Sequence, residues 1–452
     1  MLGIARGLLD RRWSVSFLGS SLHQAAIEAS GVAFYRLQGA ADLQRPAGPN
    51  SANVPEHDSL PWPQQQQQQA PPSAQGQSYQ SLEALPDAYA SLCAALSDLY
   101  SSSPGRRVVV LAEAFFYGAV ALRLGAPLPE GVPERPRSLC VSVTPPAIRS
   151  ADLPPFGFPF PFDPSAQGRA RNAALWAEWE RRAAPLTRLL DAKLREAGVV
   201  VAGKVGVLMA GGNYTCHERI LQVGLPGLEY PRCDFPAQFR IVGIMPRSTT
   251  GSAKRPEFDW WSEILANSEL AADDPARKKV VVVTQGTVQT NPDDLLIPAM
   301  QALSQREDVL VVMILGSRGA RLPASVAMAT NARVADYLSY GAVLPYTDLW
   351  VHNGGYGAVT QGIAHGIPMV IAGDGQDKPE CAKRVGWSGI GLDLGVTRPG
   401  KERLGDAIEQ VLREERFRAR AEELKRESEA INIFDNVEEE ILKVASEAPL
   451  PR

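Results

Sequence analysis

The segment from Leu349 to Ala372 carries the residue types best suited to chemistry in this chain. It reads as an apolar strand, a turn Asn353-Gly-Gly-Tyr-Gly357, a helix and a second apolar strand. Gly354, Gly355 and Gly357 let the backbone approach a ligand closely, and the following helix presents unpaired N–H groups at the positive end of its dipole. The pattern predicts an anion site, best suited to phosphate.

A short polar segment follows the second strand and contains Asp377 and Lys378. In an open α/β sheet this is the carboxyl edge, where ligands bind. A carboxylate is expected beside a phosphate site where it accepts hydrogen bonds from hydroxyl groups. A sugar attached to a diphosphate would account for both features.

These motifs resemble the nucleotide-sugar-binding domain of the UDP-glycosyltransferases, an inverting family with the GT-B fold that glycosylates small lipophilic molecules. The order and the spacing of the motifs agree with that family. The resemblance covers nearly the whole chain except a Gln-rich insertion, and it is closest to the bacterial and fungal branch. The matching stretches are Val283-Thr-Gln-Gly-Thr287, Val334 to Leu338, Val343-Leu-Pro345, Asn353 to Gly357, Ala364-His-Gly-Ile-Pro368, Asp377 to Ala382, Pro226 to Arg232 and Leu85 to Leu128.

The resemblance implies roles for individual residues. The uracil ring is expected against Tyr337, while the Gly286 backbone and Thr287 meet the diphosphate. The family's common His, Asn and Ser positions are occupied here by Asn353, Gly357 and Ala358, with His352 one place earlier. His352 is therefore either a direct contact or a structural residue. The donor-binding candidates are Gly286, Thr287, Tyr337, His352, Asn353, Gly354, Gly355, Gly357, Ala358, Asp377 and Lys378.

The sugar-binding pair departs from the family pattern. Asp377 matches, but Lys378 replaces the usual Gln, so a cationic donor stands where an amide would both donate and accept. UDP-glucose is the expected donor, with hexose identity left open. No Asp-x-Asp metal motif occurs in the chain, and neither a metal nor another cofactor is expected. His365, in Ala364-His-Gly-Ile-Pro368, is expected to be structural.

The catalytic base is the weak point of the resemblance. In the family it is a His in the loop after the first strand, whereas the sequence starts on the helix that follows, Met1 to Arg12. That strand and its His are therefore expected to be missing, and His23, on the next helix, is no substitute. The family's partner Asp corresponds to Glu113, which either acts as a catalytic carboxylate or serves as a helix cap or ion-pair partner.

Three functions remain open on these residues. The first is transfer of a hexose from a UDP-sugar to a hydroxyl of a small lipophilic acceptor, with inversion. The second is a catalytically impaired or inactive nucleotide-sugar-binding homologue, and the third is a nucleotide-sugar epimerase or hydrolase of the same architecture. The proline- and phenylalanine-rich stretch from Pro145 to Pro164 is either an acceptor wall or simple loop packing.

The composition limits the class of protein. The 452 residues carry 46 Lys+Arg and 50 Asp+Glu, a net charge of −4, and this balance excludes a typical nucleic-acid-binding surface. The longest apolar runs, such as Val309 to Leu315, are far shorter than the ~20 residues of a membrane-spanning helix. Five cysteines without C-x-x-C spacing fit a reducing cytoplasm.

The elements that must position these residues alternate between helical and strand patterns. This alternation predicts two doubly wound α/β domains. The family resemblance implies that they are Rossmann-like and face each other across a cleft. The predicted bounds are an acceptor-binding domain at 1–245 with a low-complexity insertion at 40–81, a linker at 246–279, a nucleotide-sugar-binding domain at 280–430 and a helical tail at 431–452.

Overall fold

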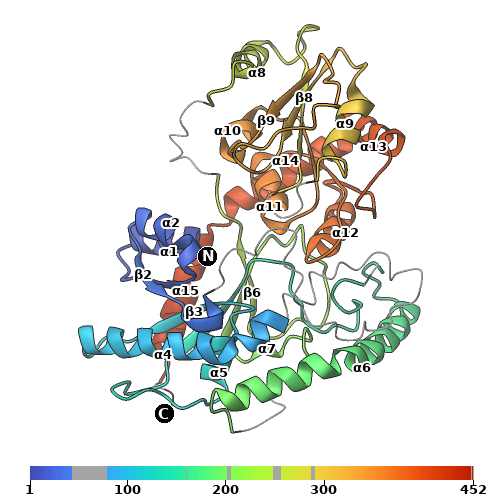
Figure 1. The fold of residues 1–452 in the computed structure, drawn as a ribbon. Helices are drawn as coiled ribbons and strands as arrows, with labels where there is room; N and C mark the ends of the chain where they lie inside the picture. The colour runs from blue at the N-terminus through green and yellow to red at the C-terminus, as the bar shows by residue number, and fades with distance from the viewer. Residues whose placement is uncertain are drawn as a thin grey trace. The chain divides into compact units, whose positions relative to one another are not determined.

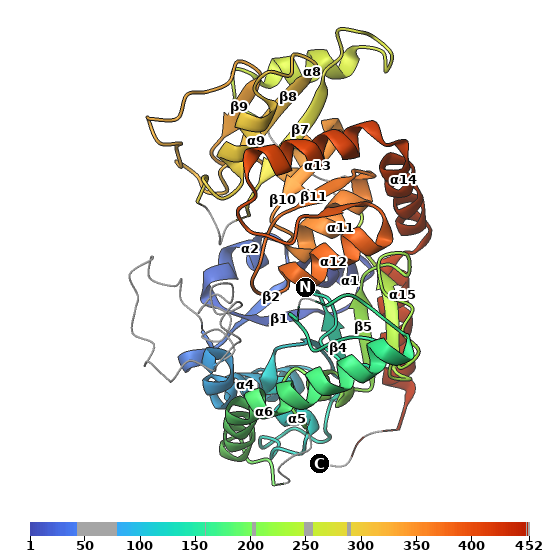
Figure 2. The ribbon, with the colours of Figure 1, turned by 90° about the vertical axis from the view of Figure 1, so that its right-hand side faces the viewer.

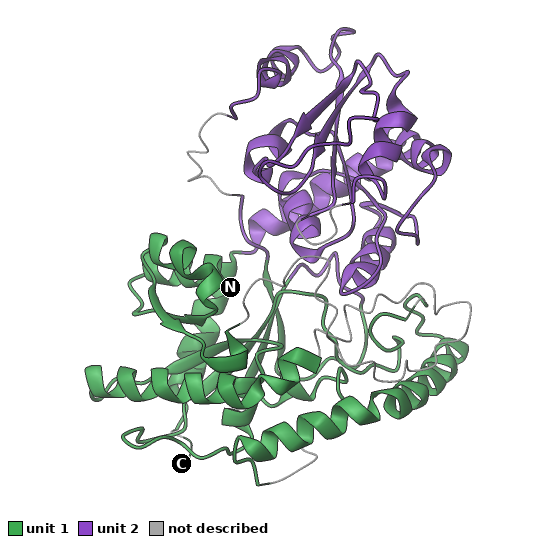
Figure 3. Ribbon diagram, in the orientation of Figure 1, with its two compact units in different colours: residues 1–223, 231–243, 432–452 green, residues 224–230, 244–431 purple. Residues whose placement is uncertain are grey.

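The chain forms two compact units in a computed structural model (Figure 3). The structure describes residues 1–42, 79–158, 160–200, 205–247, 256–286, 291–448 and 450. Unit 1 comprises residues 1–223, 231–243 and 432–452, and unit 2 comprises 224–230 and 244–431. Most of the insertion predicted at 40–81 lies outside the described residues.

Unit 1 is an α/β unit with two parallel sheets (Figure 1). Strands β1 and β2 form a two-stranded sheet, and a four-stranded sheet has the order β3-β4-β5-β6. Its elements are α1 Leu2–Asp10, β1 Ser16–Gly19, α2 Gln24–Ala29, β2 Ala33–Arg36, α4 Leu85–Ser102, β3 Val109–Glu113, α5 Tyr117–Arg123, β4 Arg137–Ser142, α6 Ala166–Glu196, α7 Gly212–Thr215, β5 Arg219–Val223, β6 Phe239–Gly243 and α15 Ile433–Ser446.

The larger core of unit 1 is built from helix faces. Leu85, Leu92 and Leu96 are spaced as one face of α4 and pack with Leu122 of α5 and Leu190 of α6. Connecting segments follow the carboxyl ends of β3, β4 and β5, after Glu113, Ser142 and Val223. Such loop-lined strand ends are where parallel sheets usually bind ligands.

Unit 2 is a second α/β unit with one parallel sheet. Its six strands have the order β12-β11-β10-β7-β8-β9. Its elements are α8 Trp261–Glu269, β7 Lys279–Thr284, α9 Leu296–Leu303, β8 Val309–Ile314, β9 Ala332–Ala335, α10 Tyr340–Val343, β10 Leu349–His352, α11 Tyr356–His365, β11 Met369–Ile371, α12 Lys378–Ser388, β12 Gly391–Asp393, α13 Lys401–Arg413 and α14 Glu415–Ala430.

Both faces of the unit 2 sheet are covered by helices (Figures 1 and 2). Because side chains alternate along a strand, Val281 and Val283 of β7 face α9 and α13, whereas Val280 and Val282 face α8 and α10. All four are fully buried. Continuous apolar strands such as β7 and β8 are typical of a parallel sheet buried on both sides.

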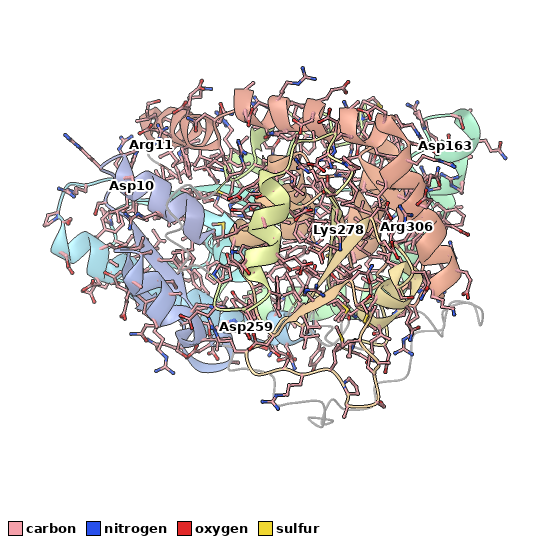
Figure 4. All side chains as sticks on the ribbon, turned by 90° about the horizontal axis from the view of Figure 1, so that it is seen from above. Asp10, Arg11, Asp163, Asp259, Lys278 and Arg306 are labelled. Carbon is pink, nitrogen blue, oxygen red and sulfur yellow. The ribbon has the colours of Figure 1, made fainter. Side chains whose placement is uncertain are left out.

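An ion pair ties the start of β8 to a covering helix. Arg306, labelled in Figure 4, donates from Nε to Asp308 at 2.7 Å and also pairs with Glu409 of α13. Both carboxylates raise the pKa of Arg306, chiefly through the hydrogen bond that Arg306 donates to Asp308. These partners therefore favour the charged form of the guanidinium.

The units divide the chain differently from the sequence-based bounds. Residues 224–230 belong to unit 2 although the chain then returns to unit 1, and α15, within the stretch expected as a separate tail, is part of unit 1. The expected linker at 246–279 contains α8, which is part of unit 2. None of the helices in the described ranges is both long enough and apolar enough to span a membrane.

Candidate functional site

The strand order of unit 2 points to one position for a site. From β7 the chain adds β8 and β9 on one side, and it then crosses back to add β10, β11 and β12 on the other. Connections therefore diverge between β7 and β10, which pair in parallel with His352 opposite Thr284. This is the topological switch point, where open α/β sheets hold ligands at their carboxyl ends.

The turn after β10 is shaped by glycine and histidine. Gly354 has φ +89°, and a Cβ there would lie 2.7 Å from Ile371 Cγ2, so a larger residue is strained and obstructed. Its N–H donates to His352 Nδ1 at 3.1 Å, and His352 Nε2 lies 3.4 Å from the thioether sulfur, Sδ, of Met369. Burial lowers the pKa of His352 to about 3, so the ring is neutral. His352 supports the turn, and its contact with a donor stays a prediction.

The helix that follows this turn begins beside open space. Gly355 is the N-cap of α11, and a Cβ added at Gly355 or at Gly357 meets no heavy atom within 4 Å. Ala358 belongs to the first turn, where its N–H donates to Gly355 O at 3.0 Å. A helix N-terminus with free space in front of it suits an anion, because its N–H groups and dipole both favour negative charge.

Asn353 joins the two central strands across the switch point. It is 8% exposed, and its Nδ2 donates to the backbone carbonyl of Gln285 just after β7. Gly286 follows with φ +76°, and a Cβ there meets nothing within 4 Å. The structure thus brings together the Gln285-Gly286 turn and the turn after β10. Thr287, predicted to meet the diphosphate, lies outside the described residues.

Asp377 lies at the start of α11 although it is 21 residues further along the chain. Its Oδ2 accepts a hydrogen bond from Tyr356 N at 3.4 Å and from Cys381 Sγ at 3.7 Å. It is also the N-cap residue of α12. The predicted proximity of this carboxylate to the glycine turn is therefore present in the structure.

Lys378 is buried beside the same turn. It is 6% exposed, its Cβ lies within 3.6 Å of the position of a Cβ on Gly354, and its Nζ donates to Gln376 Oε1 at 3.2 Å. Burial lowers the pKa of Lys378, while Asp377 and Asp374 oppose that shift. The amine is a donor held close to the sugar-binding candidate Asp377.

Three residues that follow strands of the unit 2 sheet were not singled out from sequence. Gln285 is 3% exposed, and its Oε1 has no hydrogen-bond partner among the described residues. Arg318 lies over the ring of Tyr337, which is 44% exposed, and Asp336 accepts two backbone hydrogen bonds beside them. Gln285 and Asp336 sit within stretches that resemble the family, whereas Arg318 lies in a loop whose sequence carries no periodic signal.

Glu113 lies at the carboxyl end of β3 in unit 1, opposite Val141 of β4. Its Oε2 accepts a hydrogen bond from Phe115 N at 2.8 Å. Burial raises the pKa of Glu113, while the backbone N–H groups of Phe115 and Ala114 and the charge of the Met1 amino group oppose this rise. A carboxyl with a raised pKa is closer to the range useful for a general base than an ordinary glutamate.

Two further histidines were expected to play no direct role. His365 ends α11, and its Nδ1 lies 2.9 Å from the carbonyl oxygen of Gln361. His23 ends a short 3-10 helix, Ser21–His23, between β1 and α2. Neither lies at the strand ends that form the switch point of unit 2.

Comparison with known proteins identifies close relatives. The family model described as erythromycin biosynthesis protein CIII-like, C-terminal domain, matches residues 300–442. UDP-glucosyltransferase 1 of Beauveria bassiana (strain ARSEF 2860) is 37% identical over 364 residues, covering 79% of this chain and 76% of that protein. UDP-glucosyltransferase B1 of Starmerella bombicola is 32% identical over 454 residues, covering 99% of this chain and 95% of that protein.

Solved structures share the fold at lower identity. The glycosyltransferase of kitacinnamycin has a TM-score of 0.67 at 20% identity, covering 100% of this chain and 95% of that chain. The spinosyn rhamnosyltransferase has a TM-score of 0.60 at 17% identity, covering 98% and 95%. Both are glycosyltransferases of the GT-B fold class expected from the sequence. With relatives at this identity over most of its length, the chain belongs to the UDP-glycosyltransferase family.

Proposed function

We propose that the chain transfers glucose from UDP-glucose to a hydroxyl group of a small lipophilic acceptor, with inversion and without a metal ion or other cofactor. The observation that carries this proposal is the open N-terminus of α11 at the switch point, with Asp377 beside it. The relatives named UDP-glucosyltransferases support the choice of donor. We also propose a cytoplasmic location, because all five cysteines are free thiols.

The first step of the proposed mechanism is binding of the diphosphate. The N-terminus of α11 and the Gly286 turn provide backbone N–H groups and open space for its oxygens. Asp377 accepts hydrogen bonds from sugar hydroxyls, and Lys378 donates to them. The bond from Tyr356 N to Asp377 is long enough, at 3.4 Å, to be exchanged for a ligand contact at small cost.

The second step is a single displacement. A base takes the proton of the acceptor hydroxyl, the acceptor oxygen forms a bond to the anomeric carbon, and the bond from that carbon to the β-phosphate oxygen breaks. UDP leaves with the electron pair, and the positive end of α11 stabilises its charge. Glu113 is the proposed base, because burial raises the pKa of its carboxyl.

Transfer and binding assays test this function and separate it from the alternatives. Product formed from UDP-glucose and a phenolic acceptor supports the transferase. UDP binding without turnover would instead indicate a nucleotide-sugar-binding homologue. Interconversion of free UDP-sugar without an acceptor would indicate an epimerase.

The role of Asp377 has its own test. Asp377→Ala should lower kcat/KM for UDP-glucose by about 10- to 100-fold, because the lost acceptor serves the sugar, while the Kd for UDP changes little. Isothermal titration and steady-state kinetics on the same preparation measure both quantities. Equal loss of UDP binding would contradict the assignment to the sugar.

A further inference from the structure

A cation covers the aromatic ring expected to meet the nucleotide base. The guanidinium carbon of Arg318 lies 4.9 Å from the ring centroid of Tyr337. Arg318 follows β8 and Tyr337 follows β9, so both stand at the carboxyl edge of the unit 2 sheet. Both side chains are exposed, and they are 19 residues apart in the sequence.

Asp336 fixes the backbone on both sides of this pair. Its Oδ2 accepts a hydrogen bond from Gly319 N at 2.6 Å, and its Oδ1 accepts one from Tyr337 N at 2.7 Å. These backbone bonds, with Gly319 first, lower the pKa of Asp336, so it remains a charged acceptor. The loop carrying Arg318 is therefore held to the residue before Tyr337, while the Arg318 side chain itself is exposed.

The distance between the Arg318 guanidinium and the Tyr337 ring determines how a nucleotide base could bind there. Two flat groups in contact are about 3.5 Å apart, so a ring between Tyr337 and a guanidinium needs about 7 Å. The observed 4.9 Å is too short for a base between them, and the guanidinium must move outward by about 2 Å. A long exposed arginine side chain can do this by changing rotamers while Asp336 keeps the loop in place.

We propose that Arg318 and Tyr337 form a slot for the uracil ring, in which the guanidinium leaves the tyrosine when the base stacks there and then covers the outer face of the base. This inference rests on the proposed function and adds a residue to it. Arginine suits the position because its planar guanidinium stacks on flat rings, whereas the ammonium of lysine is a point charge. Covering the second face removes the base from water on both sides.

The test measures affinity for UDP and for inorganic diphosphate with purified full-length variants. Arg318→Ala should raise the Kd for UDP about 3- to 30-fold, in the range of a partly desolvated cation–π contact, and leave the Kd for diphosphate unchanged. Arg318→Lys should recover only a small part of that loss. In kinetics, KM for UDP-glucose should rise and kcat should stay near the wild-type value, because the base is remote from the reacting bonds.

Arg321→Ala is the matched control. Arg321 is an exposed arginine three residues further on, and it lines a pocket whose other residues include Phe258, Trp260 and Asp336. Its loss should change neither Kd, and thermal melting of all variants checks that they fold. An equal loss of UDP and diphosphate affinity in Arg318→Ala, or full rescue by lysine, would overturn the base slot in favour of a phosphate contact.

Failure of the proposed function gives a different result. If the wild-type protein itself does not bind UDP, the function proposed above is wrong. If the wild type binds UDP and Arg318→Ala binds it equally well, only the base slot is wrong.

Discussion

Gly354 and Gly355, in the turn after β10, are expected to differ in what an alanine substitution changes: the stability of the fold at Gly354 and ligand binding at Gly355. Gly354→Ala should lower the melting temperature, because φ is +89° and the new Cβ lies 2.7 Å from Ile371 Cγ2. Gly355→Ala should leave the melting temperature unchanged, because nothing lies within 4 Å. It should nevertheless raise the Kd for UDP about tenfold or more, since the methyl group enters the space proposed for the diphosphate. Unchanged UDP binding in Gly355→Ala would show that the diphosphate lies elsewhere.

Substitution of Gln285 distinguishes a residue that contacts the donor from one that only supports the fold. Its buried Oε1 lacks a partner within the described ranges, and such an unpaired acceptor costs about 1–3 kcal/mol. Gln285→Leu should therefore leave the free energy of unfolding unchanged or raise it by about 1 kcal/mol, while KM for the donor rises because a ligand contact is lost.

The control for Gln285 is Thr397→Val. Thr397 also has a buried oxygen without a partner in the part of the chain that the structure describes, and it follows β12 at the far edge of the sheet. The valine variant should gain stability in the same way but keep the wild-type KM. A Gln285→Leu enzyme with unchanged KM would remove Gln285 from the donor site.

Glu113 should make stability depend on pH. Burial raises the pKa of this carboxyl in the folded state, so its contribution is fully present below the unfolded pKa and is lost as pH rises through the folded pKa. Glu113→Gln cannot ionise, so its melting temperature should match the wild type near pH 4 and exceed it toward pH 8. Melting curves across this pH range measure the difference. If the wild type instead gained stability relative to the variant as the pH rises, burial would not raise the pKa of Glu113.

At the scale of elements, a buried ion cluster holds α12 and thereby its N-cap residue, Asp377. Arg384 donates to Glu229 at 2.8 and 3.0 Å and to Glu380 at 3.0 Å, and its guanidinium carbon lies 4.6 Å from the Tyr230 ring centroid. Burial alone would lower the pKa of Arg384, but Glu229, Tyr230 and Glu380 together raise it well above its usual value. The arginine is thus charged inside the protein and depends on these partners.

Removing one partner should be costly. Glu229→Gln should lower the free energy of unfolding of unit 2 by about 3 kcal/mol, because it leaves a buried charge without full compensation. The matched control is Glu423→Gln, which breaks an exposed pair with Arg420 and should cost no more than about 0.5 kcal/mol. Urea unfolding of the two variants measures the difference, and equal effects would show that the cluster adds no more than a surface pair.

The elements around the donor turn could be predicted because their signals are local. The strand, turn, helix and second strand predicted between Leu349 and Ala372 are β10, the turn after it, α11 and β11. Two short strands were missed, β6 at Phe239–Gly243 and β12 at Gly391–Asp393, because three to five residues give too little periodicity. Arg318 was missed for another reason, because its contact with Tyr337 depends on the loop after β8 folding back onto the residues that follow β9.

At the scale of the whole molecule, the chain passes between its two units four times, at 223/224, 230/231, 243/244 and 431/432. The sequence predicts two α/β domains from their alternating elements, but it does not tell which unit the last helix joins. Tertiary contacts show that the last helix, α15, belongs to unit 1. Trp13 Nε1 donates to Glu438 Oε1 at 2.7 Å, Arg11 of Figure 4 pairs with the same carboxylate at 2.7 Å, and Arg219 pairs with Glu440 at 3.0 Å.

Helix α15 should therefore stabilise unit 1 and not unit 2, and two neighbouring residues provide the test. Ile441 is 2% exposed, whereas Leu442 is 54% exposed. Ile441→Ala should cost about 2–5 kcal/mol by leaving a cavity, and Leu442→Ala should cost little. Because two units need not unfold together, hydrogen exchange is the suitable measurement. Ile441→Ala should lose amide protection in β3 to β6 while β7 to β12 keep theirs, and equal loss in both sheets would show that the units unfold as one.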